Sequence, residues 1–150
     1  MKRIGFLSFG HYRHVVGARV PDAAAALRQH VDLARIADEV GLDGAWVRVH
    51  HFEESHASPM PLLAAMAAVT TRIDVGTGVL DLRYENPLHL AEQAAATDLL
   101  SGGRLQLGIS RGSPEHAVDG QKQFGYRLSD GESWADHAHS KAARFRRAIA

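Results

Sequence analysis

The 150-residue sequence contains no cysteine, which excludes disulfides, thiolate metal ligands and cysteine nucleophiles. It has no excess charge either, because 17 lysines and arginines balance 17 aspartates and glutamates. This balance gives no indication of binding to nucleic acid or to an acidic membrane surface. No apolar run is long enough to span a membrane, and the apolar run at the N-terminus is too short for a secretion signal. We therefore expect a soluble, cytoplasmic protein.

The sequence does contain a regular alternation of short apolar runs and helical patterns. Strands are predicted at residues 3–9, 44–49, 73–80 and 104–110. Helices are predicted at residues 21–41, 58–72, 86–103 and 132–150, with a long loop at 111–131. The last helical pattern continues to residue 150 without a stop signal, which is unusual for a complete domain.

Local signals support the predicted helix boundaries. Ser58 and Asn86 are expected to cap the second and third helices, and each is followed by a proline at the first helical position. Gly41 is expected to end the first helix, and Gly102 or Gly103 the third. Four apolar residues recur at helical spacing in the first helix and indicate an apolar face: Leu33, Ile36, Ala37 and Val40.

Strict alternation of strands and helices implies a parallel sheet with right-handed crossovers. Two architectures fit this pattern, an open doubly wound sheet and half of an eight-stranded β/α barrel. The open sheet normally carries a glycine-rich phosphate turn after its first strand. The segment at that place reads SFGHYRHVVG, without the expected glycine spacing. A dinucleotide-binding site of that kind is therefore not expected.

Polar, glycine-rich and ionisable residues collect at the carboxyl ends of the predicted strands. These segments are residues 8–11, 50–53, 76–79 and 110–112. Both architectures bind their ligands at this end of the sheet. This coincidence is the strongest physical indication of a functional site.

The segment VHHFEESHASP at residues 49–59 leaves three interpretations open. A metal-dependent hydrolase would use His50, His51 and His56, but the spacing lacks the helical H-E-x-x-H geometry of many zinc sites. A solvated loop with ordinary histidines is the second interpretation. An acid–base or ligand-orienting role is the third, since imidazole exchanges its proton near neutral pH. Adjacent side chains on an extended segment point to opposite sides, so one of the paired histidines is expected to pack behind the other.

Two other segments also have both a structural and a functional interpretation. Gly76 and Gly78 either mark a bulge in the third strand or let a flat ligand lie against its backbone. Arg111 is either a surface charge or a contact to an anionic or carbonyl-bearing ligand. The residues alone leave these alternatives open.

Two long segments resemble the bacterial luciferase-like family of flavin-dependent monooxygenases. They read GAWVRVHHF and TTRIDVGTGVLDLRYENPLHLAEQAAATDLLSGGRLQLGISRG, and the resemblance extends over residues 3–112. It implies an α/β fold in which residues 1–150 form a single domain, half of a TIM-type (β/α)8 barrel with four parallel β-α units. It also implies a flavin-dependent oxidoreductase that acts on an unidentified small organic substrate.

The resemblance further implies a cofactor and its site residues. The cofactor is reduced FMN, or the deazaflavin F420 in some branches of the family, bound at the carboxyl ends of the strands, and no metal is implied. His50 is similar to the family's catalytic histidine, with His51 as the second candidate. A cis peptide bond is expected between Gly78 and Val79. The residues expected to contact the cofactor are Phe9, Gly76, Thr77, Gly78, Val79, Ser110 and Arg111.

The sequence departs from the family pattern in two respects. Val49 stands where many members have a glutamate, and only four of the eight strands are present. We therefore expect either a homo-oligomer that completes the barrel or a partner chain that carries its C-terminal half. A non-catalytic half-barrel that binds flavin or protein is the alternative. Six aliphatic residues that alternate along the strands are expected to line a partly uncovered face: Val47, Val49, Ile73, Val75, Leu105 and Leu107.

Overall fold

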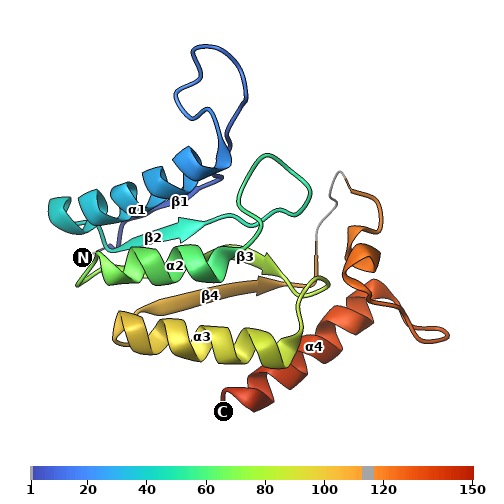
Figure 1. Cartoon of the computed structure of the whole chain (residues 1–150). Helices are drawn as coiled ribbons and strands as arrows, with labels where there is room; N and C mark the ends of the chain where they lie inside the picture. The colour runs from blue at the N-terminus through green and yellow to red at the C-terminus, as the bar shows by residue number, and fades with distance from the viewer. Residues whose placement is uncertain (1, 113–116) are drawn as a thin grey trace.

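The computed structural model describes residues 2–112 and 117–150 and contains one parallel sheet in the order β1-β2-β3-β4 (Figure 1). The strands are β1 (Gly5–Ser8), β2 (Gly44–Val47), β3 (Asp74–Asp81) and β4 (Leu105–Ser110). Each strand is followed by a helix: α1 (Ala23–Val40), α2 (Pro59–Ala68), α3 (Pro87–Ser101) and α4 (Trp134–Ala148). The prediction of four parallel β-α units is confirmed.

Three segments differ from their predicted structure, and one of them is α2, which ends at Ala68 rather than at residue 72. Strand β2 ends at Val47 rather than at residue 49, because the backbone then turns toward the following loop, where His50 N donates to His56 O at 2.9 Å. The predicted loop at 111–131 contains a 3-10 turn, η1 (Gly120–Phe124). Such a short turn has no apolar periodicity that the sequence could reveal. Residues 113–116 of that loop lie outside the described residues.

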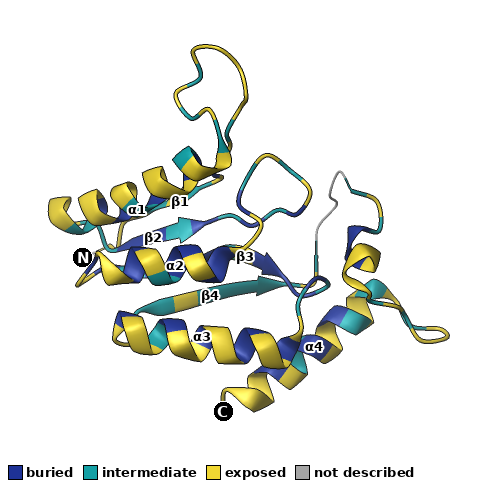
Figure 2. Ribbon diagram, viewed as in Figure 1, coloured by how far each residue is buried: buried dark blue, intermediate teal, exposed yellow. Residues whose placement is uncertain are grey.

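Helices α1, α2 and α3 cover one face of the sheet (Figure 1), and the buried core lies between the two layers (Figure 2). Val47, Ile73 and Val75 are completely buried there. Leu105 and Leu107 are only half-buried, because β4 is an edge strand. The expectation that these residues line the uncovered face is therefore wrong for the central strands. The uncovered face is the opposite one.

Helix α1 packs on the sheet through small residues rather than through its large aliphatic ones. Its buried residues are Ala26, His30, Ala34 and Ala37. Leu33, Ile36 and Val40 remain 37%, 43% and 69% exposed. The spacing therefore identified the helix correctly, but only Ala37 of the expected apolar face is in the core. The alanines allow the helix axis to lie close to the strands.

The predicted helix caps are largely confirmed. Asn86 Oδ1 accepts hydrogen bonds from Leu88 N at 3.0 Å and His89 N at 3.2 Å. Gly41 and Gly102 end α1 and α3 in the left-handed conformation, which glycine adopts without a steric penalty. Ser58 precedes α2 as expected, but its side chain forms no capping hydrogen bond. Among the described helices, none has the length and apolar character needed to cross a membrane.

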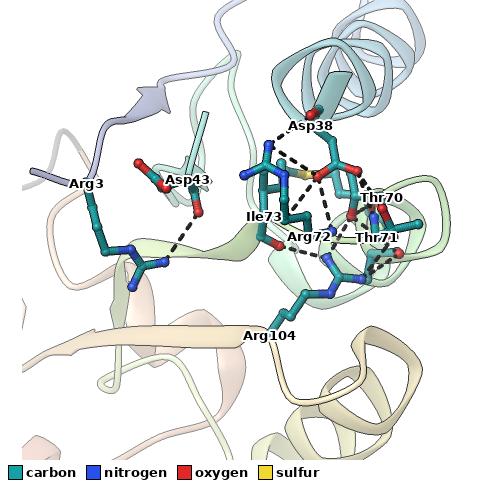
Figure 3. Close-up of polar contacts among 10 residues, drawn as sticks. Arg3, Asp38, Asp43, Thr70, Thr71, Arg72, Ile73 and Arg104 are labelled. Carbon is teal, nitrogen blue, oxygen red and sulfur yellow. Dashed lines mark hydrogen bonds and ion pairs between the residues drawn. The ribbon is translucent and has the colours of Figure 1, made fainter. Parts of the chain in front are cut away.

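A polar network joins the elements at the amino ends of the strands (Figure 3). The Asp38 carboxylate accepts from Thr71 N, Arg72 N and Ile73 N at 2.8 to 3.2 Å. The Arg104 guanidinium donates to several oxygens at the end of α2 and the start of β3: Ala67 O, Thr70 O, Thr70 Oγ1 and Ile73 O. In β/α folds this end of the sheet serves stability, which leaves the carboxyl ends for a site.

Candidate active site

The alternation of side chains along β2 brings His50 to the open face of the sheet. Val47 and Val49 point toward the helices and are 0% and 6% exposed. Trp46, Arg48 and His50 therefore point to the other side, because neighbouring residues in an extended segment alternate. The half-buried His50 lies beyond the carboxyl end of β2.

His50 is held between a cation and a carboxylate. Arg48 Nε donates a hydrogen bond to His50 Nε2. On the other side of the ring, His50 Nδ1 lies 3.4 Å from Glu53 Oε1. The side chains of His50 and Glu53 are only 16% and 19% exposed. Both ring nitrogens thus face an ionisable partner.

His51 occupies a different environment from its neighbour. Its ring stacks on Tyr84, with 4.2 Å between centroids, and meets the edge of Phe124 at 5.2 Å. Together with Phe52, these residues form an aromatic cluster that joins the ends of β2 and β3 to η1. Burial lowers the pKa of His51, and the nearby Asp81 carboxylate opposes this shift. The packing favours His50 over His51 as the chemical residue.

His56 is separated from both and packs against α1. Its ring lies perpendicular to that of His30, with 4.2 Å between centroids, and both side chains are almost completely buried. Burial, together with His30 and His11, lowers the pKa of His56 to about 4. Among residues 2–112 and 117–150, no three His, Cys, Asp or Glu side chains are grouped to hold a metal ion. The geometry thus gives no support to the hydrolase interpretation.

The glycine-rich part of β3 contains the expected cis peptide bond between Gly78 and Val79. Here the pairing with β4 shifts by one residue, so both expected features of the segment, a bulge and an exposed backbone, occur together. Val79 is 43% exposed on the open face. Gly76 has no free space, since a Cβ built on this glycine would clash with Gln106 O and would lie 2.9 Å from Trp46 Nε1. Thr77 points the other way, and its hydroxyl donates to Gly108 O at 2.8 Å.

The remaining predicted contacts lie on either side of this segment. Phe9 is 46% exposed at the end of β1, with the Arg48 guanidinium 5.2 Å from its ring centroid. Ser110 and Arg111, at the end of β4, line a pocket of about 420 Å³ together with His139 of α4. Phe9 is thus joined to His50 through Arg48, whereas Ser110 and Arg111 belong to a pocket under α4.

The open face around Gly78 fits a flat aromatic cofactor. A Cβ at Gly78 would lie 3.1 Å from Leu7 Cδ1, so the end of the Leu7 side chain borders this glycine. Leu7 and Val79, both about half exposed, provide apolar surface beside it. Sites for small organic molecules commonly combine such apolar surface with a few polar groups.

Sequence reasoning missed Trp46, Arg48 and Glu53. The first two could have been found by counting back from His50 in steps of two, because β2 is extended. Nothing in the sequence indicates that Glu53 turns back toward His50. That contact depends on the loop conformation, in which Phe52 adopts a positive φ of 60°.

The comparison with known proteins agrees with this arrangement. Residues 1–147 match the luciferase-like monooxygenases. The chain belongs to this family. The 4-hydroxyprotoasukamycin monooxygenase of Streptomyces nodosus subsp. asukaensis is 36% identical over 115 residues, which are 75% of this chain and 30% of that protein.

Solved structures share the fold of this luciferase-like chain. One is the oxygenating constituent of 3,6-diketocamphane monooxygenase from the CAM plasmid of Pseudomonas putida, a type II Baeyer-Villiger monooxygenase in complex with FMN. Its TM-score is 0.77 at 23% identity, over 95% of this chain and 38% of that one. Another is the coenzyme F420-dependent tetrahydromethanopterin reductase of Methanopyrus kandleri, with a TM-score of 0.58 at 23% identity, over 74% and 27%. The chain thus spans well under half the length of these relatives, as a half-barrel would.

Proposed function

We propose that this chain forms the cofactor-binding half of a luciferase-like flavin-dependent monooxygenase that acts on a small organic molecule. The cofactor is reduced FMN, with F420 as the alternative. Family membership supports the reaction class, and the FMN and F420 proteins of the same fold support the choice of cofactors. The identity of the organic substrate depends on loops that this half of the barrel does not contain.

The observation that carries this proposal is the half-exposed surface of Leu7, Gly78 and Val79 on the same sheet face as His50. When bound, reduced flavin supplies the electrons for the reaction with oxygen. The chain provides the flat surface at Gly78 that orients the ring, with Leu7 and Val79 excluding water from one side. His50 holds or moves a proton at a ring nitrogen, a role that suits imidazole.

Enlarging Gly78 tests the cofactor site. Gly78→Phe is expected to abolish binding of reduced FMN, because its ring would occupy the flat surface. Gly78→Ala is the matched control and should retain binding, since its added methyl group meets only the flexible end of Leu7. Anaerobic titration with reduced FMN, and in parallel with reduced F420, measures both variants and identifies the cofactor.

Equal affinity of Gly78→Phe and the unmodified chain would place the flavin elsewhere. Binding without any turnover would favour the non-catalytic alternative.

We also propose that the half-barrel is completed by a second copy, or by a separate chain that carries the other half. Within residues 2–112 and 117–150, strands β1 and β4 have one unpaired edge each, and no helix covers the face with Leu7 and Val79. Leaving several hundred Å² of apolar surface in water costs on the order of 10 kcal/mol, as much as the stability of a whole domain. A twofold axis parallel to the strands would place β4 of one copy beside β1 of the other and keep all eight strands parallel.

The two flanks of the sheet support this pairing. On the β1 side, α1 exposes Leu33, Ile36 and Val40. On the β4 side, a groove of about 940 Å³ lies between α3 and α4, and its lining includes Leu105 and Phe145. In the twofold arrangement these two apolar flanks meet.

The assembly is tested by light scattering of the 150-residue chain at micromolar concentration. We expect a species of twice the mass of one chain. Ile36→Glu should shift this species toward the monomer, because it would bury a charge in the interface between the two copies. Val16→Glu, at a fully exposed loop position, is the control and should not change the mass. A well-folded monomer of the unmodified chain would refute the proposal.

A further inference from the structure

Arg48 lies on the same sheet face as His50, two residues before it. Its side chain crosses toward β1, where the guanidinium carbon lies 5.2 Å from the centroid of the Phe9 ring. The backbone N of Arg48 donates to Ser8 O at 2.8 Å, which keeps this part of the chain next to β1. Arg48 is thus held at two points before it reaches His50.

The contact between Arg48 and His50 determines where the imidazole carries its proton. Arginine has only donors and stays charged, so the nitrogen that it contacts must accept. His50 Nε2 therefore has no hydrogen, and the neutral ring carries its proton on Nδ1. Among the described residues the buried Nδ1 atom makes no hydrogen bond, and the nearby carboxylate oxygen Glu53 Oε1, at 3.4 Å, favours an N–H on this side of the ring. The two partners thus favour the same tautomer.

We propose that Arg48 and Glu53 are positioning residues that hold His50 as the neutral tautomer with its proton on Nδ1. This inference rests on the proposed acid–base role of His50 and adds a direction to it. The N–H of the ring is then on Nδ1, beside Glu53, and the lone pair of Nε2 faces the Arg48 guanidinium. Second partners of this kind commonly fix the tautomer of a functional histidine.

Nitrogen NMR of the 150-residue chain with isotope-labelled histidine tests the proposal without flavin. The signals of His50 are identified among the ten histidines by their loss in His50→Gln. In the unmodified chain we expect a protonated Nδ1 and an unprotonated Nε2. In Arg48→Met we expect protonation to move to Nε2, and in Arg48→Lys the original tautomer should be partly retained, because lysine is also a cationic donor. Circular dichroism confirms that each variant is folded.

Arg35→Met is the matched control, since it removes an arginine whose exposed partner is Glu39 on the surface of α1. It should leave the His50 signals unchanged. An unchanged tautomer in folded Arg48→Met would overturn the proposal, as would a protonated Nε2 in the unmodified chain. Glu53→Gln keeps an oxygen acceptor beside Nδ1. It should therefore reduce the fraction of His50 with its proton on Nδ1 less than Arg48→Met does.

Measuring turnover distinguishes a failure of this inference from a failure of the proposed function. In an active, flavin-loaded assembly, Arg48→Met should lower kcat roughly 10-fold, a part of the usual acid–base contribution, with flavin affinity retained. A tautomer change in a protein that binds no flavin would sustain the positioning role and contradict the proposed function. Full kcat in a variant whose tautomer has changed would contradict the role of Arg48 in catalysis.

Discussion

Replacing His50 with alanine is expected to lower turnover of the assembled, flavin-loaded protein by about 10²- to 10⁴-fold, the usual contribution of general acid–base help. Flavin affinity should stay within about a few-fold, because His50 is one group among several beside the cofactor surface. Single-turnover kinetics with reduced FMN and oxygen, combined with a flavin titration, measures the two effects separately.

His51→Phe is the matched comparison for His50→Ala. Phenylalanine retains the ring that stacks on Tyr84 and meets Phe124, and it removes both nitrogens. Because burial lowers the pKa of His51, its charged form is already disfavoured and its loss should matter little to proton transfer. Nearly full turnover in His51→Phe is therefore expected. A loss as large as that of His50→Ala would transfer the chemical role to His51.

Replacing Arg104 with methionine is expected to lower the free energy of unfolding by roughly 3–5 kcal/mol. The guanidinium donates to Ala67 O, Thr70 O and Ile73 O at 2.7 to 3.1 Å. Removing the donor leaves several partly buried carbonyl groups without this partner, and each such group costs about 1–3 kcal/mol. It also removes a positive charge from the C-terminal end of α2, where the helix dipole favours one (Figure 3).

Urea denaturation of the unmodified chain and the variant at equal protein concentration measures this loss. The midpoint should fall by about 2 M if the slope is near the middle of its usual range. Arg35→Met makes the same chemical change on an exposed helix pair, where the loss should stay below about 0.5 kcal/mol. Similar midpoints for the two variants would mean that the network around Arg104 does not stabilise the sheet.

The predictions for His50 and Arg104 rest on different contacts. The sequence predicts one of these arrangements and not the other. The sequence alone predicted that His50 and His51 would be separated, because adjacent side chains on an extended segment diverge. It did not predict that Arg104 connects α2 and β3, since Ala67, Thr70 and Ile73, whose oxygens it binds, lie more than 30 positions earlier in the chain. Hydrogen bonds over such distances depend on how the helices dock.

Local signals determined most of the architecture. Repeated units of apolar strand and amphipathic helix specified a parallel sheet, and Asn86, Gly41 and Gly102 marked helix ends through the conformations that they favour. The glycines around Gly78 marked the strand that leaves its backbone uncovered. Each of these features acts within a few residues, so the sequence contains the whole signal.

Only the tertiary structure decided which surfaces these elements present. Leu33, Ile36 and Val40 of α1 point outward, whereas Ala34 and Ala37 belong to the core and His30 is buried beside them. The Gln106 carbonyl and the Trp46 indole enclose Gly76, whereas Gly78 is bordered by the end of the Leu7 side chain. Arg48 and Glu53 reach His50 from two sides through the course of the β2 loop. These contacts are set by packing among segments that are distant or sharply turned, and periodicity along the chain contains no information about them.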